Sequence, residues 1–184
     1  WWDWLTPFSL LTGLALAVGY ALLGATWLVM KTSGQLQRRA RGLAWVAAIA
    51  TLVLIGAVSL ITPFLNPAYL QRWFAFPTAI FSAVVPGLVL LAAWALFRGL
   101  LDHKQAQPFL AALALFVLCF AGLGISFYPY IVPTSVTIWQ AAAPEASLIF
   151  LLVGAAVLIP IILGYTAYAY WVFRGKVDPE EGYH

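Results

Sequence analysis

Five long apolar runs, separated by short polar connections, restrict this chain to very few folds. Each run reaches the ~20 residues that a helix needs to cross the ~30 Å hydrocarbon core of a bilayer. Lipid offers no water to backbone groups, and the runs lack the alternation of barrel strands, so they predict helices. The sequence therefore predicts an all-α, polytopic membrane bundle. It is expected to be a single domain over residues 1–184, with spans at roughly 7–30, 43–61, 78–97, 109–127 and 146–173.

The composition is that of a membrane protein. Hydrophobic residues make up 64% of the chain and charged residues 8%, whereas soluble domains are about half apolar and about a quarter charged. The basic residues lie between the apolar runs, so we interpret the net charge of +3 as a topology signal and expect no nucleic-acid partner. Cys119 is the only cysteine and can form no internal disulfide. The start at Trp1 has neither a methionine nor a signal peptide, so we expect a piece of a longer polypeptide.

The basic residues predict the orientation. Eight of the nine fall on one side of the predicted spans: Lys31, Arg38, Arg39, Arg41, Arg98, Lys104, Arg174 and Lys176. Arg72 alone falls on the other side. The positive-inside rule therefore predicts that the C-terminus is cytoplasmic, and that the first residues and the loops at 63–77 and 127–146 are external. Aromatic residues near the span ends are expected to act as interfacial anchors: Trp1, Trp2, Trp4, Trp73, Phe74, Tyr128, Tyr130, Trp139, Tyr170 and Trp171.

Prolines and small residues add local expectations. Thr6-Pro7 predicts a helix start, because proline is pre-set for the first helical position, and Thr62-Pro63 is expected to end the second span. Pro86 and Pro160 predict kinks, and Glu145 is expected in the first turn of the last span, where its charge opposes the helix dipole. Small residues are expected to allow close helix packing: Gly13, Ala17, Ala21, Ala25, Gly122, Gly124, Gly154 and Gly164.

The chemistry that the spans can carry is limited. No Asp, Glu, Lys, Arg or His lies deep within a predicted span, which argues against an ion-coupled transporter or a proton-pump core. The residues that could ligate haem iron are poorly placed, since His103 lies in a connection, His184 ends the chain and Met30 ends the first span. We therefore expect no catalytic residue, no metal ligand and no bound haem in this chain.

The remaining polar residues in the spans are hydroxyls: Thr12, Thr26, Thr51, Ser59, Ser82, Ser126, Tyr165, Thr166 and Tyr168. Such groups usually bond a carbonyl one turn back or a neighbouring helix. A quinone or a water chain could use Tyr165, Thr166 or Tyr168, and Arg38, Arg39 and Arg41 could hold anionic lipid headgroups. Packing and topology are sufficient to explain both sets.

Several segments together resemble subunit II of the cytochrome bd quinol oxidases. They are Trp4-Leu5-Thr6-Pro7-Phe8, the stretch from Gly24 to Thr32, Phe127 to Ser135, and Pro160 to Trp171. The similarity covers nearly the whole chain, and the outer Arg72-Trp73-Phe74 resembles the cyanide-insensitive branch.

The resemblance implies an accessory subunit without haem. In this family subunit I carries the three haems, of types b and d, and the quinol-oxidising loop. Subunit II has two four-helix bundles and one extra helix, and it packs against subunit I as a pseudo-symmetric heterodimer in the bacterial inner membrane. The complex oxidises quinol and reduces dioxygen to water. Five spans fit the latter part of such a nine-helix subunit.

Two other readings remain open. A small polytopic transporter or permease would need polar midplane groups and broken helices, and only the prolines offer these. A membrane enzyme with its own site in the 127–146 loop would have one carboxylate, no histidine and no cysteine there. The residues by themselves support a helical membrane subunit.

Overall fold

A computed structural model describes residues 5–65, 73–74, 78–132 and 135–176, with backbone alone at 78–82. The described part contains five helices long and apolar enough to cross a membrane, which confirms the predicted all-α membrane bundle. The chain divides into two compact units, residues up to 126 and residues 127–176, and each is described by itself. Several predicted features lie outside the described residues: the anchors Trp1, Trp2 and Trp4, the outer Arg72, the Ser82 hydroxyl, Pro133-Thr134 and His184.

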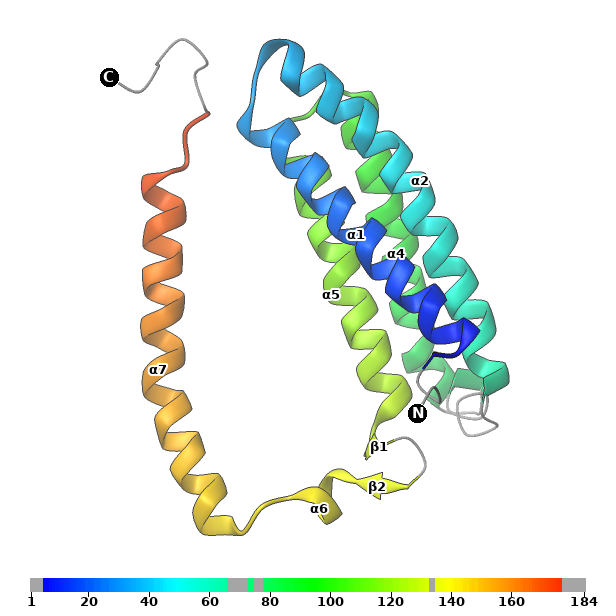
Figure 1. Ribbon diagram of the computed structural model, residues 1–184, viewed down its shortest axis with the longest axis vertical. Helices are drawn as coiled ribbons and strands as arrows, with labels where there is room; N and C mark the ends of the chain where they lie inside the picture. Colours follow the sequence, from blue (N-terminus) through cyan, green and yellow to red (C-terminus); the bar gives the residue numbers. More distant parts are fainter. Residues whose placement is uncertain (1–4, 66–72, 75–77, 133–134, 177–184) are drawn as a thin grey trace. The chain divides into compact units, whose positions relative to one another are not determined.

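The first unit begins with an antiparallel helix pair (Figure 1), α1 (Pro7–Lys31) and α2 (Gly34–Leu65). The predicted start at Thr6-Pro7 is confirmed, because Thr6 caps α1 by accepting a hydrogen bond from the Ser9 backbone N–H. Only Thr32 and Ser33 separate the two helices.

Helix α2 is longer at both ends than its predicted span. It starts at Gly34, so Arg38, Arg39 and Arg41 occupy its first turns rather than a loop. It also continues through Pro63 to Leu65, so the predicted end at Thr62-Pro63 was wrong. The Thr62 hydroxyl donates to the Val58 carbonyl at 2.7 Å, a bond one turn back that remains compatible with helical backbone at this point.

The other pair of the first unit is α4 (Thr78–Leu101) and α5 (Gln107–Phe127). Helix α4 remains helical through Pro86. The kink expected at Pro86 stays a prediction. It extends four residues beyond its predicted span, to Leu101, because the residue that breaks it comes later: His103 has a positive φ of 55°. This left-handed residue reverses the chain between the two helices.

A small-residue core holds the four helices together. Its buried members come from all four: Leu22, Ala25, Ala44, Ala48, Ala92, Leu96, Leu100, Ala111, Ala112 and Leu115. The buried face of α1 runs through Gly19, Leu22, Ala25, Thr26 and Val29. Of the small residues of α1 that were expected to pack, Ala25 is buried, whereas Gly13, Ala17 and Ala21 are exposed in this chain, so close packing at these three stays a prediction.

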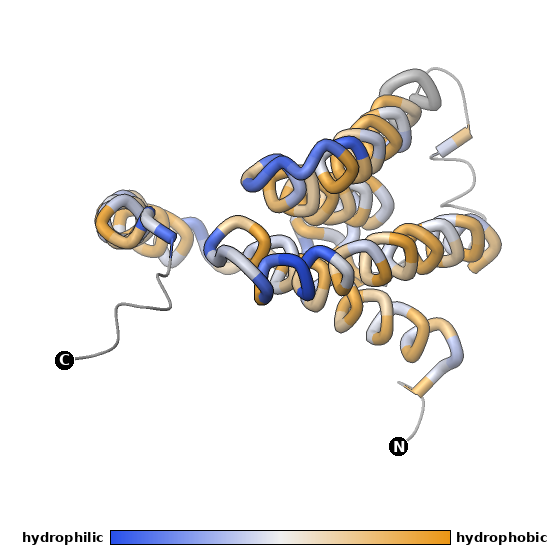
Figure 2. The backbone as a smooth tube through the Cα atoms, turned by 90° about the horizontal axis from the view of Figure 1, so that it is seen from above, coloured by the Kyte–Doolittle hydropathy of each residue, from blue (hydrophilic) through white to orange (hydrophobic). Residues whose placement is uncertain are grey.

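The second unit combines a short hairpin with a long helix. Strands β1 (Tyr130–Val132) and β2 (Val136–Thr137) pair antiparallel and lead into α6 (Ile138–Ala141). Sequence patterns did not predict this hairpin, because its strands are only three and two residues long. Helix α7 (Glu145–Val172) follows, with Glu145 in its first turn as predicted and Pro160 inside it. None of its residues is buried. Figure 2 shows how largely apolar the helices of both units are along their lengths.

Candidate functional surfaces

The residues considered as metal or haem ligands lie apart within the described part of the chain. His103 is exposed in the α4–α5 turn, Met30 is half-buried near the end of α1, and Cys119 is exposed on α5. The described residues include no group of three or more His, Cys, Asp or Glu side chains that could hold a metal ion. His103 has a backbone role instead. Its left-handed conformation allows the Lys104 N–H to donate to the Gly99 carbonyl at 2.9 Å, which terminates α4.

Basic residues gather at one end of the first unit, which we call the basic end: Lys31, Arg38, Arg39, Arg41, Arg98 and Lys104. They belong to the α1–α2 turn region and to the α4–α5 turn region, and Arg41 joins these regions by donating to the Leu100 carbonyl at 3.4 Å. Asp102 is the only carboxylate among the described residues of this unit, and it pairs with Arg98 at 2.8 Å. The basic end therefore carries a clear positive excess.

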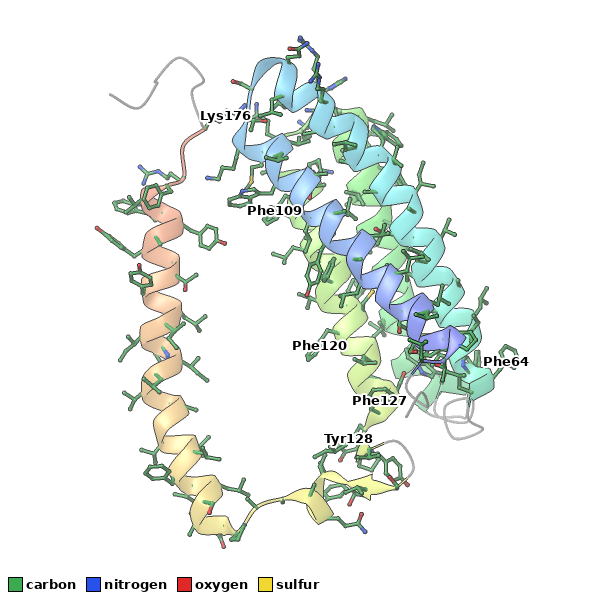
Figure 3. The ribbon with its side chains drawn as sticks, in the orientation of Figure 1. Phe64, Phe109, Phe120, Phe127, Tyr128 and Lys176 are labelled. Carbon is green, nitrogen blue, oxygen red and sulfur yellow. The ribbon has the colours of Figure 1, made fainter. Side chains whose placement is uncertain are left out.

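Side chains bond the carbonyls of neighbouring helices at the basic end. The Gln37 amide donates to the Val29 carbonyl of α1 at 2.8 Å, and the Gln107 amide donates to the Ala95 carbonyl of α4 at 2.9 Å. The Trp27 ring contacts the Phe109 ring edge-on, with centroids 5.1 Å apart, and Lys31 lies over Trp27. Figure 3 labels Phe109 on α5. These contacts give the basic end a defined geometry.

Three of the predicted span hydroxyls in the first unit follow the expected pattern. Thr12, Thr26 and Ser126 donate to carbonyls three or four residues back, at 2.8–2.9 Å. Ser126 also accepts a hydrogen bond from the Trp73 indole N–H at 3.0 Å. The Thr51 hydroxyl is buried without a hydrogen-bond partner among the described residues. Because Thr51 sits on the α2 face that carries Ala44 and Ala48, it is part of the bundle core.

An apolar groove of about 760 Å³ runs between α4 and α5. Alanines on both helices form part of its lining, namely Ala92, Ala95, Ala111 and Ala114. Leucine and valine side chains line it as well, and Gln107 lies at its end toward the basic end. We call this feature the α4–α5 groove. Sequence reasoning missed it, although the spacing of the alanines by three on each helix was a signal.

The second unit carries aromatic side chains at both of its ends. In the hairpin, Tyr128 and Trp139 meet edge-on with centroids 6.1 Å apart, and Figure 3 labels Tyr128. At the far end of α7, Arg174 lies over the Trp171 ring, 4.7 Å from its centroid. Both pairs are exposed, as expected for interfacial anchors.

The proposed quinone-binding residues Tyr165, Thr166 and Tyr168 all lie exposed on α7. Nothing in the described part of the second unit encloses them as a pocket would, so a quinone or water role for them stays a prediction. The lipid contacts proposed for Arg38 and Arg39 have the exposure that they require.

Comparison with known proteins gives one family. The sequence matches the family described as cytochrome bd terminal oxidase subunit II over residues 1–173. It is 28% identical to the cytochrome bd-I ubiquinol oxidase subunit 2 of Escherichia coli strain K12, over 208 aligned positions that cover 96% of this chain and 54% of the relative. It is also 28% identical to the probable cytochrome oxidase subunit 2 of Haemophilus influenzae, covering 95% of this chain and 53% of the relative. The chain thus spans about half the length of the curated relatives that it matches.

Proposed function

This chain belongs to the cytochrome bd terminal oxidase subunit II family, and we propose that it serves as the accessory subunit of a bd-type quinol oxidase. It packs against a haem-bearing subunit I in a heterodimer and supports it, while the complex oxidises quinol and reduces dioxygen to water. The match over residues 1–173 carries this proposal.

The described residues support an accessory role without haem. The residues that could ligate iron are scattered and lie outside the bundle core, and the buried polar groups of the first unit are hydroxyls rather than imidazoles or thiolates. We propose that the partner subunit binds haems b and d. The first unit is a four-helix bundle, which agrees with the architecture that the family resemblance implies.

The proposed setting is the bacterial inner membrane, with the basic end and the C-terminus in the cytoplasm. Six basic residues at one end of the first unit support this orientation. The hairpin of the second unit then faces outward, and residues 1–184 act as one transmembrane domain. Membrane lipid and quinone are the remaining proposed partners, and membership of the cyanide-insensitive branch stays a prediction.

A small transporter or permease is the competing function. Such proteins bind substrate near the membrane midplane, between discontinuous helices with polar groups. Here α4 and α7 remain continuous through Pro86 and Pro160, and the Asp, Glu, Lys, Arg and His side chains of the described spans lie toward helix ends. No described feature favours transport over the oxidase.

The test is a reduced-minus-oxidised visible spectrum of the full-length subunit, purified alone and together with its subunit I. We expect haem bands only in the joint preparation, accompanied by quinol-dependent oxygen uptake. Stoichiometric haem on the isolated subunit would contradict the accessory role, because it would require an iron ligand in this subunit. Absence of haem from both preparations would favour the transporter.

A further inference from the structure

The α4–α5 groove has the length of one membrane leaflet. On α5 its lining extends from Gln107 to Leu118, which corresponds to ~16 Å at ~1.5 Å per residue. This is about half of the ~30 Å hydrocarbon core. A groove made for a covering transmembrane helix should continue along the whole span. One acyl chain of a lipid in a single leaflet fits the observed extent better.

The groove is shaped for a slender apolar chain. The buried Ala92 and Ala111 form its floor, and the side chains that rise beside them stay largely exposed, Leu91 at 57% and Leu110 at 59%. The Gln107 side-chain amide, which lines the groove, already donates a hydrogen bond to the Ala95 carbonyl. The lining therefore offers apolar contact along its length rather than a polar site within the hydrocarbon.

Basic residues lie beyond the end of the groove, toward the membrane surface. Arg98 lies three residues beyond the lining residue Ala95, on the same stripe of α4, and Lys104 follows in the exposed turn. Asp102 binds the Nε of Arg98, yet 60% of the Arg98 side chain remains exposed. An apolar groove that ends beside basic side chains is complementary to an amphiphile with one apolar tail in the groove and an anionic head.

We propose that the α4–α5 groove binds one acyl chain of an anionic phospholipid, whose headgroup phosphate contacts Arg98 and Lys104. The lipid belongs to the leaflet at the basic end. This lipid site does not depend on the oxidase function of the complex.

Binding of dioleoylphosphatidylglycerol and dioleoylphosphatidylcholine to the purified full-length protein tests the site, with native mass spectrometry in detergent as the measurement. The two lipids share their acyl chains and differ in headgroup charge. We expect the anionic lipid to bind at least about tenfold more tightly. Equal affinities would overturn the proposal.

Two charge variants separate a site from diffuse attraction. Lys104→Gln removes a charge beside the groove, and Arg39→Gln removes one from an exposed position of α2 at the same basic end. We expect Lys104→Gln to weaken phosphatidylglycerol binding several-fold and Arg39→Gln to leave it nearly unchanged. Equal losses would mean that the basic end attracts anionic lipid without a defined site, and would overturn the proposal.

Two groove variants test the acyl-chain contact. Ala114→Phe fills the groove, and Ala121→Phe adds the same ring one heptad further along α5, beyond the groove lining. Only Ala114→Phe should reduce phosphatidylglycerol binding, and Ala114→Leu is the milder substitute if the larger ring prevents folding. Unchanged binding in a folded Ala114 variant would overturn the acyl-chain contact.

Discussion

At the scale of single residues, His103 has a backbone role although imidazole is a common metal ligand, because its left-handed φ of 55° ends α4. The sequence could show that this histidine lay in a connection. It could not show the left-handed conformation, which is uncommon for any residue other than glycine.

His103→Gly is therefore expected to stabilise the protein by about 1 kcal/mol, since glycine adopts this φ without the Cβ clash. Thermal unfolding of the full-length protein measures the change, and His103→Ala is the control because alanine keeps the Cβ. Both variants should leave the haem spectrum of the complex unchanged. Loss of haem in both would identify His103 as a ligand and contradict its purely structural role.

Gly19 is the residue of α1 at which a side chain would collide with the bundle. A Cβ there would lie 2.8 Å from the Phe116 ring, whereas one at Gly13 would meet nothing within 4 Å. Gly19→Ala should therefore be less stable than Gly13→Ala by about 1–3 kcal/mol. Thermal unfolding of both variants gives the difference. Adding Phe116→Leu should recover much of the loss, and a failure to recover it would place the clash elsewhere.

Among the elements, the membrane helices were predictable and their ends were not. The length of the apolar runs predicted five helices. A span predicted from hydropathy ends at the first charged residues, so the first turns of α2, which carry Arg38 and Arg41, were not predicted. The buried face of α1 was predicted only at Ala25, because glycine and alanine occur on both faces of this helix and only contacts with the other helices select one face. The α4–α5 groove depends on two helices at once, so the alanine spacing on each helix was not sufficient to predict it.

The Trp73–Ser126 hydrogen bond ties the end of α5 to the segment before α4. Ser126→Ala should cost about 1 kcal/mol, because the half-buried indole N–H of Trp73 loses a hydrogen-bond partner. A double-mutant cycle with Trp73→Phe, followed by thermal unfolding, isolates the pair, whose coupling we expect to be about 0.6 kcal/mol as for other membrane hydrogen bonds. Additive losses would show that the two side chains contribute independently.

At the scale of the whole molecule, family membership could be predicted from the sequence, because several segments resemble the family together and the family match covers residues 1–173. The α4–α5 groove was less predictable, since it is a surface formed by two helices. Surfaces arise from neighbours in space, whereas catalytic residues carry their own chemistry.

The proposed orientation predicts the behaviour of reporter fusions to the full-length protein. Alkaline phosphatase should be active when fused after Ala142, in the connection before α7, because this enzyme matures outside the cytoplasm. Green fluorescent protein should fluoresce when fused after Lys176, beyond α7. The reverse pattern would contradict the orientation inferred from the basic end.

The two-residue turn between α1 and α2 has a consequence for biogenesis. Only Thr32 and Ser33 separate the two helices, so α2 leaves the ribosome immediately after α1. The connection is too short for either helix to enter the bilayer independently of the other. We therefore expect the two helices to insert together as one helical hairpin. In the proposed orientation, the arginines of α2 keep this turn on the cytoplasmic side, where synthesis occurs.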